Sequence, residues 1–386
     1  MKINHNMKKI ALSDIDFGEE EIRKVAEVLK SKWISMGELT KEFEQKFACY
    51  MKVKHAIAIS NCTASLHLAN LALGVKPGDE IIVPSLTFVA TSNSVLYSGA
   101  KPVFADVEGK DNFNISPDSI IEKISKKTKG IIVVHYGGYP CDMERIMDIA
   151  HDNNLFVIED AAHAPGAHIS GKMLGTIGDI GCFSFFSNKN MVTGEGGMVV
   201  TNDDMLAEKI KMKRSHGMTS LSWDKYKGHA FSYDVTTLGF NYRANEISSA
   251  LGLCQLKKLD NNNAIRKDLS DLYRKNLKKA EFISVPFKKI TGESSHHIFP
   301  ILLDKKVDRT KFMEFLKSEG VQTSIHYPLI HLFSYYRDTF GFKEGMLPIT
   351  EYIGRNEVTL PLHPLLTKED VKYIIDRILE FGETLE

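Results

Sequence analysis

Short apolar runs alternate with helical patterns over the first half of this chain, and this alternation constrains its fold more than any other feature. The runs have the length of buried strands and lie at residues 55–59, 80–83, 102–105, 130–133, 155–158, 182–185 and 197–201. Helical patterns lie between most of them, for example at residues 64–73 and 143–152. Such an order is typical of α/β domains, in which helices cover both faces of a largely parallel sheet.

The sequence changes character after about residue 245. The later elements are predicted as a long helix at 246–279, strands at 297–303 and 321–326, and helices at 309–318 and 368–383. The length of 386 residues also exceeds the usual size of one hydrophobic core. We therefore expect a large α/β domain over residues 1–250 and a small α+β domain over residues 251–386. Helices at 19–31 and 39–50 would form an N-terminal arm of the large domain.

Charge and composition exclude several classes of protein. Lys and Arg number 49, as do Asp and Glu. No net positive field therefore exists to bind nucleic acid or an anionic membrane surface. The five cysteines are far apart and form no C-x-x-C pair, which argues against a disulfide framework. No apolar run is long enough to span a bilayer, and residues 1–9 lack the apolar core of a signal peptide. We expect a cytoplasmic protein.

Two predicted strand ends carry side chains suited to catalysis. Asp160 follows the run 155–158, and ligands of parallel sheets bind beyond the carboxyl ends of strands. Its carboxylate would either meet a cofactor or cap a following helix. Lys189 lies in a polar turn after the run 182–185, ahead of a glycine-rich turn at 194–197. A lysine there can form a Schiff base with a carbonyl compound, although a solvated surface lysine is the alternative.

A third segment indicates an anion site. The sequence SNCTA at 60–64 follows the run 55–59 and opens a helix, whose free N–H groups and dipole favour phosphate. Simple capping by Ser or Thr is the alternative. The glycines at 194–197 would let a bulky planar ligand approach the backbone. A phosphate site, an acid and a lysine at strand ends together predict pyridoxal phosphate (PLP), whose phosphate, ring nitrogen and aldehyde need these three groups.

Further motifs follow one another along nearly the whole chain. They are WISMG at 33–37, SNCTA at 60–64, PSLTFVAT at 84–91, EDAAH at 159–163, FSF at 183–185, KN at 189–190, GEGG at 194–197, GFNYR at 239–243, HYP at 326–328 and LPLHP at 360–364. In this order they resemble the DegT/DnrJ/StrS family of sugar aminotransferases. The resemblance implies a fold-type I PLP-dependent transferase, with a mostly parallel sheet in the large domain.

Carried over position by position, the resemblance implies roles for residues of a cofactor site. Lys189 would bind PLP as a Schiff base and later move a proton. Asp160 would pair with the pyridine nitrogen. The backbone amides of Thr63 and Ala64 and the hydroxyl of Ser184 would hold the phosphate.

The remaining implied roles concern the ring, the substrate and a second subunit. Phe88 would lie against the ring, and His163 would lie near its 3-hydroxyl group. His326 and Tyr327 would contact the substrate. Asn241 would reach the phosphate in a neighbouring subunit, which implies a homodimer with shared active sites.

The implied reaction moves an amino group from an amino acid, with L-glutamate expected as the donor, to C3 or C4 of a nucleotide-linked keto-sugar. The product would be an amino or deoxy sugar for a surface polysaccharide or a secondary metabolite. An aminotransferase of a keto-cyclitol stays open as an alternative. Lys189 argues against a pyridoxamine-dependent sugar dehydratase, in which histidine replaces the lysine. Lys189 and Asp160 together argue against a non-catalytic regulator.

Three other features bear on the site. No H-E-x-x-H motif or close Cys/His cluster is present, so no metal is expected. The tract 220–233 carries Trp223, Tyr226 and His229 among lysines, and we expect a substrate-side or dimer-side loop there rather than a nucleic-acid patch. Cys62 stands where many relatives have glycine, so a left-handed backbone at that position would be strained.

Overall fold

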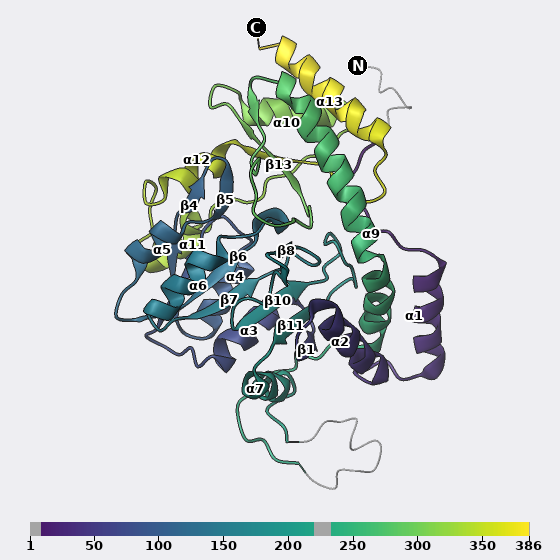
Figure 1. The fold of residues 1–386 in the computed structure, drawn as a ribbon, viewed down its shortest axis with the longest axis vertical. Helices are drawn as coiled ribbons and strands as arrows, with labels where there is room; N and C mark the ends of the chain where they lie inside the picture. Colours follow the sequence, from purple (N-terminus) through teal and green to yellow (C-terminus); the bar gives the residue numbers. More distant parts are fainter. Residues whose placement is uncertain (1–8, 220–232, 386) are drawn as a thin grey trace.

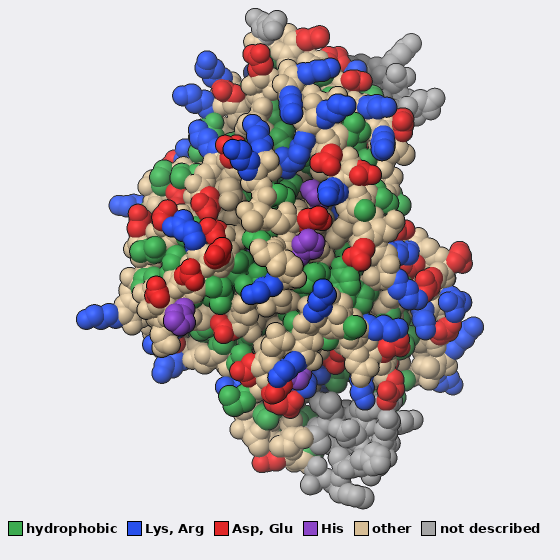
Figure 2. All heavy atoms as spheres, viewed as in Figure 1, with side chains coloured by type: hydrophobic (Ala, Val, Ile, Leu, Met, Phe, Trp, Pro, Cys, Tyr) green, Lys and Arg blue, Asp and Glu red, His purple; other side chains and the backbone are tan. Residues whose placement is uncertain are grey.

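The computed structural model describes residues 9–219 and 233–385, which form a central sheet, the helices around it and a smaller second sheet (Figure 1). Trp223, Tyr226 and His229 of the predicted loop lie outside the described residues. Basic and acidic side chains are interspersed over the visible face (Figure 2). Within the described ranges, no helix combines the length and the apolar character that crossing a membrane requires.

The central sheet has seven strands in the order β1-β11-β10-β7-β6-β2-β3. Their bounds are β1 His55–Ile59, β2 Glu80–Pro84, β3 Lys101–Ala105, β6 Thr128–Val134, β7 Phe156–Asp160, β10 Ile180–Ser184 and β11 Gly197–Thr201. β11 pairs antiparallel with both of its neighbours, and the other pairs are parallel. Each predicted apolar run is therefore a strand of one mostly parallel sheet, and the predicted α/β class is confirmed.

Helices cover both faces of this sheet. Those that precede or alternate with the strands are α1 Glu19–Ser31, α2 Glu38–Met51, α3 Cys62–Ala72, α4 Ala90–Tyr97, α5 Pro117–Lys123, α6 Met143–Asp152 and α7 Asp204–Arg214. Short elements lie between them: the hairpins β4 Val107–Gly109 with β5 Asn112–Ile115 and β8 His168–Ile169 with β9 Lys172–Met173, and the 3-10 turn η1 Tyr136–Gly138. The arm helices predicted at 19–31 and 39–50 correspond to α1 and α2.

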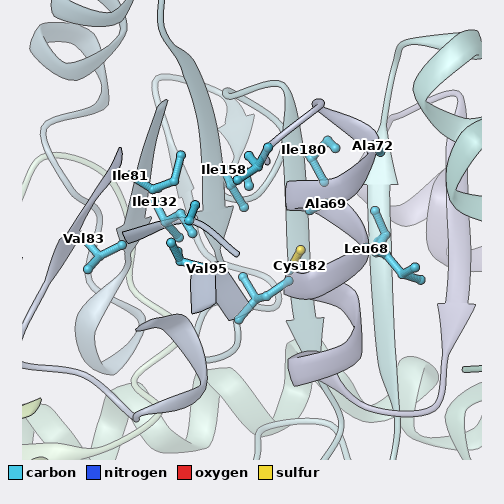
Figure 3. Packing of buried hydrophobic residues seen from close by; sticks show 14 of the residues in the cluster. Leu68, Ala69, Ala72, Ile81, Val83, Val95, Ile132, Ile158, Ile180 and Cys182 are labelled. Atoms are coloured by element: carbon cyan, nitrogen blue, oxygen red, sulfur yellow. The ribbon is translucent and has the colours of Figure 1, made fainter. Parts of the chain in front are cut away.

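Alternation along the strands divides the buried side chains between two faces. On β1, Ile57 and Ile59 belong to a cluster with α3, α4 and α7, whereas Ala56 and Ala58 pack in another with α2. Leu68, Ala69 and Ala72 of α3 belong to the first cluster together with strand residues such as Ile158 and Cys182 (Figure 3). This packing fixes the start of α3 against the sheet.

The second half of the chain builds the smaller sheet, β12-β13-β14. Its elements are α9 Glu246–Asn276, η2 Leu277–Lys279, β12 Ile283–Ser284, β13 Phe299–Leu303, α10 Arg309–Ser318, η3 Ile330–Leu332, α11 Ser334–Phe340, α12 Pro348–Asn356, β14 Glu357–Leu360 and α13 Lys368–Glu383. The later half of α9 shares a separate apolar core with β13, β14, α10 and α13. We propose on this basis that residues 1–250 and 251–386 are two domains, joined through α9.

One predicted strand of this region is wrong, and the strands β12 and β14 were missed. The segment 321–326 forms only isolated bridges, from Val321 to Ile10 and from Ser324 to Thr359, because it contacts two different partners at single residues. β14 was missed because Glu357 and Thr359 interrupt its apolar pattern. Both polar side chains can nevertheless be buried, because they form a hydrogen bond with each other.

Candidate active site

A cavity of about 670 Å³ lies at the carboxyl ends of the parallel strands. Asp160 is the last residue of β7, Ser184 is the last residue of β10, and Lys189 lies in the turn after β10. Nine of the ten predicted site residues line it, namely Thr63, Ala64, Phe88, Asp160, His163, Ser184, Lys189, His326 and Tyr327. Residues that are far apart in sequence meet here because parallel strands end at one edge of the sheet.

The N-terminus of α3 forms one end of this cavity. Asn61 caps the helix, and its Oδ1 accepts a hydrogen bond of 2.8 Å from the amide of Ala64. The cap is thus asparagine rather than the serine or threonine considered from sequence. The amides of Cys62 and Thr63 have no acceptor among the described residues. These two N–H groups, at the positive end of the helix, are therefore the ones left free for an anion.

The backbone at Cys62 is ordinary helix. Cys62 is the first residue of α3 and is not among the described residues with a left-handed backbone, so the strain considered from sequence is absent. The close approach is made by Gly197 of β11. A Cβ atom at Gly197 would lie 2.5 Å from the carbonyl carbon of Asn61 and 2.8 Å from the amide nitrogen of Cys62. The absence of a side chain at Gly197 thus allows β11 to pack against the start of α3. From sequence, the glycine-rich turn was instead predicted to let a planar ligand approach the backbone.

Gly197→Ala is expected to weaken cofactor binding about tenfold, because the methyl group must push Asn61 and Cys62 away from the free amides. Such overpacking costs about 1–3 kcal/mol. Titration of the variant with PLP, followed by absorbance, measures the change. Gly109→Ala is the matched control, since a Cβ at that strand glycine has no atom within 4 Å. Equal PLP affinity in both variants would show that the Gly197 contact does not shape the anion site.

Asp160 is a buried carboxylate at the floor of the site, with 4% of its surface exposed. Its Oδ2 accepts a 2.7 Å hydrogen bond from the Thr91 hydroxyl, and its Oδ1 accepts one of 3.2 Å from the amide of Ala162. Burial raises the pKa of Asp160, while Thr91, Ala162 and the Lys189 cation oppose the rise. The alternative of a helix cap is wrong, because turns rather than a helix follow β7.

Lys189 lines the cavity and is only partly exposed, so the alternative of a solvated surface lysine is wrong. Burial lowers its pKa to about 8, although Asp160 and Cys62 oppose the shift. A larger share of the amine is therefore neutral near physiological pH than for an ordinary lysine. A neutral amine is the form that attacks a carbonyl carbon.

His163 connects the sheet with the later part of the chain. Its Nδ1 accepts a 3.3 Å hydrogen bond from the amide of Gly137, and its Nε2 lies 2.9 Å from the hydroxyl oxygen of Tyr327. Burial lowers the pKa of His163 well below its usual value. The neutral ring therefore carries its proton on Nε2 and donates it to Tyr327. The hydroxyl hydrogen of Tyr327 then remains available to a ligand.

Asn241 is the one predicted site residue that does not line the cavity. It is exposed, and its backbone forms a bridge with Ser215 beyond the end of α7. Its neighbour Tyr242 does line the cavity. The predicted role of Asn241 in a second subunit therefore stays a prediction.

Some contributors to the site were missed from sequence. Thr91 holds Asp160 from the first turns of α4, and Asn61 caps α3. Asn61 could have been found as a preferred cap before a small-residue helix. Thr91 lay within a recognised motif, but only the packing of α4 shows that it reaches Asp160. Asn188 and Glu195 also line the cavity. The described residues contain no group of three His, Cys, Asp or Glu side chains that could hold a metal ion.

These residues fit the chemistry of PLP. Two free amides at a helix start suit a phosphate, a buried carboxylate suits a protonated ring nitrogen, and a partly neutral lysine suits an aldehyde. The described residues around this cavity thus supply each group that the cofactor needs.

Comparison with known proteins also indicates a PLP-dependent enzyme. The model of the DegT/DnrJ/EryC1/StrS aminotransferase family matches residues 16–379. The chain is 38% identical over 377 residues to GDP-perosamine synthase of Escherichia coli O157:H7, covering 97% of this chain and 99% of that one.

Solved structures extend the similarity to the whole fold. PseC of Helicobacter pylori, an aminotransferase involved in the biosynthesis of pseudoaminic acid, aligns with a TM-score of 0.91 at 32% identity, covering 98% of this chain and 100% of that one. Spr1654 of Streptococcus pneumoniae in its PLP form aligns with a TM-score of 0.91 at 29% identity, covering 98% and 100%. The chain therefore belongs to the DegT/DnrJ/EryC1/StrS family and is a PLP-dependent aminotransferase.

Proposed function

We propose that the protein transfers an amino group from an amino acid, L-glutamate, to C3 or C4 of a nucleotide-linked keto-sugar. The observation that carries the proposal is the single cavity that joins Lys189, Asp160 and the free amides of α3 with His326 and Tyr327. The similarity to GDP-perosamine synthase and PseC supports a sugar substrate. The product would be an amino or deoxy sugar for a surface polysaccharide or a secondary metabolite.

In this proposal each residue of the cofactor site has a defined role. The amides of Cys62 and Thr63 and the hydroxyl of Ser184 would hold the phosphate of PLP, and Asp160 would hold its ring nitrogen. Lys189 would hold the cofactor and carry a proton at Nζ. The cofactor supplies an electron sink for the bond that breaks at the substrate carbon.

Phe88 and His163 would complete the walls of the site. Phe88 is 57% exposed and forms part of the cavity lining, where an aromatic face suits a flat ring. His163 donates to Tyr327, so both side chains would act as one unit beside the ring's 3-hydroxyl group. His326 and Tyr327 would meet the sugar.

A panel of nucleotide-linked keto-sugars, incubated with L-glutamate and PLP-loaded enzyme, tests the function. Mass spectrometry is expected to find the aminated product of one or a few of them, and NMR of that product gives the aminated carbon. A keto-cyclitol in the same panel tests the alternative substrate. Amination of the cyclitol alone would contradict the proposal.

We also propose that the enzyme is a homodimer whose active sites use residues of both subunits. The exposed aromatic side chains Phe88, Tyr97 and Phe186 at the cavity support a covering surface, with exposures of 57%, 55% and 45%. The exposed Asn241 would then reach the partner's cofactor phosphate. Obligate interfaces are usually large and apolar, which fits such a surface.

Mixing two inactive variants tests this arrangement. Lys189→Ala and Asn241→Glu, refolded together, are expected to regain about a quarter of the wild-type activity. About half of the dimers are then mixed, and one of the two sites in each has both native residues. Native mass spectrometry confirms that mixed dimers form. A mixture that stays inactive despite mixed dimers would place Asn241 at the site of its own chain.

A further inference from the structure

A chain of hydrogen bonds leads from a buried carboxyl group to the ring of His326. The Nδ1 atom of His326 lies 2.9 Å from Thr359 Oγ1, and the Thr359 hydroxyl also hydrogen-bonds to Glu357 Oε1. Glu357 Oε2 accepts a 2.8 Å hydrogen bond from the backbone N–H of His326. Glu357 is 0% exposed and Thr359 is 1% exposed. Neither residue belongs to the cofactor site described above.

The far side of the same ring meets the cavity. His326 lines it, and its Nε2 has no hydrogen-bond partner among the described residues. Nε2 is also not one of the fully buried atoms that lack a partner, so it is accessible. His326 also borders a pocket of about 20 Å³ beside Thr359, which has room for about one water molecule and none for a sugar. A substrate can therefore meet this ring only in the larger cavity.

The chain of hydrogen bonds has two complete arrangements. When Glu357 is ionised, Thr359 donates to the carboxylate and accepts from Nδ1–H of His326, which leaves a lone pair on Nε2. When Glu357 is protonated, its Oε2 must remain the acceptor of the backbone N–H, so the proton resides on Oε1. Thr359 then accepts from Glu357 and donates to Nδ1, and the ring proton moves to Nε2.

We propose that Glu357 and Thr359 are positioning residues that determine whether His326 presents a hydrogen-bond donor or an acceptor to the substrate. An Nε2–H group would bind an oxygen of the sugar, such as its carbonyl or a hydroxyl group. The inference rests on the proposed function only for the identity of the substrate. The positions of the protons are a property of the protein itself.

Burial sets the pH at which the arrangement changes. It raises the pKa of Glu357 to about 8 and lowers that of His326 to about 4. His326 thus stays neutral near pH 7 while Glu357 is mostly protonated, and Nε2 is a donor. Above pH 8 Glu357 loses its proton and Nε2 becomes an acceptor.

The groups that face Glu357 do not reverse the order of the two pKa values, in which that of Glu357 lies above that of His326. They are Arg309 of α10, Tyr136 of η1, and His326 and Tyr327. The Arg309 cation lowers the pKa of Glu357, but its guanidinium donates to two backbone carbonyls rather than to the carboxylate. Tyr136 donates its hydroxyl hydrogen to the backbone carbonyl of His326 and stays neutral because burial raises its pKa.

Neutron diffraction from crystals of the PLP-loaded enzyme tests the proton arrangement directly. Data collected at about pH 6 and about pH 10 bracket the titration of Glu357 by about two pH units on each side. Deuterium is expected on Nε2 of His326 at the lower pH and on Nδ1 at the higher pH. The same deuterium position at both pH values would overturn the inference.

Variants distinguish an effect of this chain of hydrogen bonds, called the relay below, from an effect of packing alone. Glu357→Gln is expected to keep Nε2 deuterated at both pH values, because its amide oxygen accepts from the His326 backbone while its N–H₂ group donates to Thr359. Thr359→Val removes the link, and KM for the keto-sugar is expected to rise about fivefold to tenfold, with kcat changed less. Thr359→Ser keeps the hydroxyl group and is expected to restore KM to within about twofold of wild type.

The outcomes distinguish this inference from the proposed function. If no nucleotide keto-sugar is aminated, the proposed function fails, and the deuterium positions still decide the relay. If keto-sugars are aminated but Glu357→Gln leaves deuterium moving with pH as in the wild type, the relay is wrong. Equal KM values for Thr359→Val and Thr359→Ser would likewise overturn it.

Discussion

Lys189→Ala is expected to lower kcat by at least about 10⁴-fold, because it removes both the amine that holds the cofactor and the group that moves the proton. Asp160 and the amides at the start of α3 remain, so the variant is expected to bind PLP noncovalently. Steady-state kinetics with an amino acid and the keto-sugar measure the loss. Borohydride reduction of the wild-type enzyme, followed by peptide mapping, is expected to find the cofactor on Lys189.

The control for this variant is Lys311→Ala, which removes an exposed lysine on α10 that is not part of the cavity lining. Its kcat and its reduced peptide are expected to match those of the wild type. Cofactor fixed to any lysine other than Lys189 would refute the assignment. The lowered pKa of Lys189, about 8, also predicts that the cofactor-free enzyme reacts with PLP faster as the pH rises toward 8.

Asp160→Asn is expected to lower kcat about 10²-fold to 10³-fold and to weaken PLP binding, while the protein still folds. The loss of one partner from a buried charge pair costs roughly 3–5 kcal/mol. Asparagine can still accept from the Thr91 hydroxyl, but it cannot stabilise a proton on the ring nitrogen. Turnover, PLP titration and urea denaturation measure the three effects separately.

Thr91→Val is the matched control for Asp160, because it removes only the 2.7 Å hydrogen bond to the carboxylate. A net loss of about 1 kcal/mol, or roughly fivefold, is expected in activity. Full activity in Asp160→Asn would mean that the carboxylate serves the fold rather than the cofactor. An equal loss in Asp160→Asn and Thr91→Val would mean that position, rather than charge, is what the site requires.

The strands of the central sheet were predictable because each is a short apolar run between helical patterns. The burial of β1, β6 and β10 on both faces leaves a signal within each segment itself. Asp160 and Lys189 were predictable for a related reason, since a polar residue directly after such a run lies at the ligand edge of a parallel sheet. Local order along the chain was enough for these features.

Polar contacts between distant segments were not predictable in this way. β14 is a buried strand that carries the polar residues Glu357 and Thr359. Their presence in a buried strand is explained only by their hydrogen bonds to His326. The strand predicted at 321–326 failed for the same reason, because its backbone partners come from two different places. Hydrogen-bond partners across such sequence separations leave no periodic signal.

The sequence by itself determined the class of the fold, the strands that build the sheet, and the acid and lysine at their ends. The tertiary structure decided that the amides of Cys62 and Thr63, rather than that of Ala64, are free, and that Gly197 serves the meeting of β11 with α3. It also decided the pairing of His163 with Tyr327. The physical reason is that the burial of a segment can be recognised from the spacing of its apolar residues, whereas a hydrogen bond depends on where its two partners meet in the folded chain.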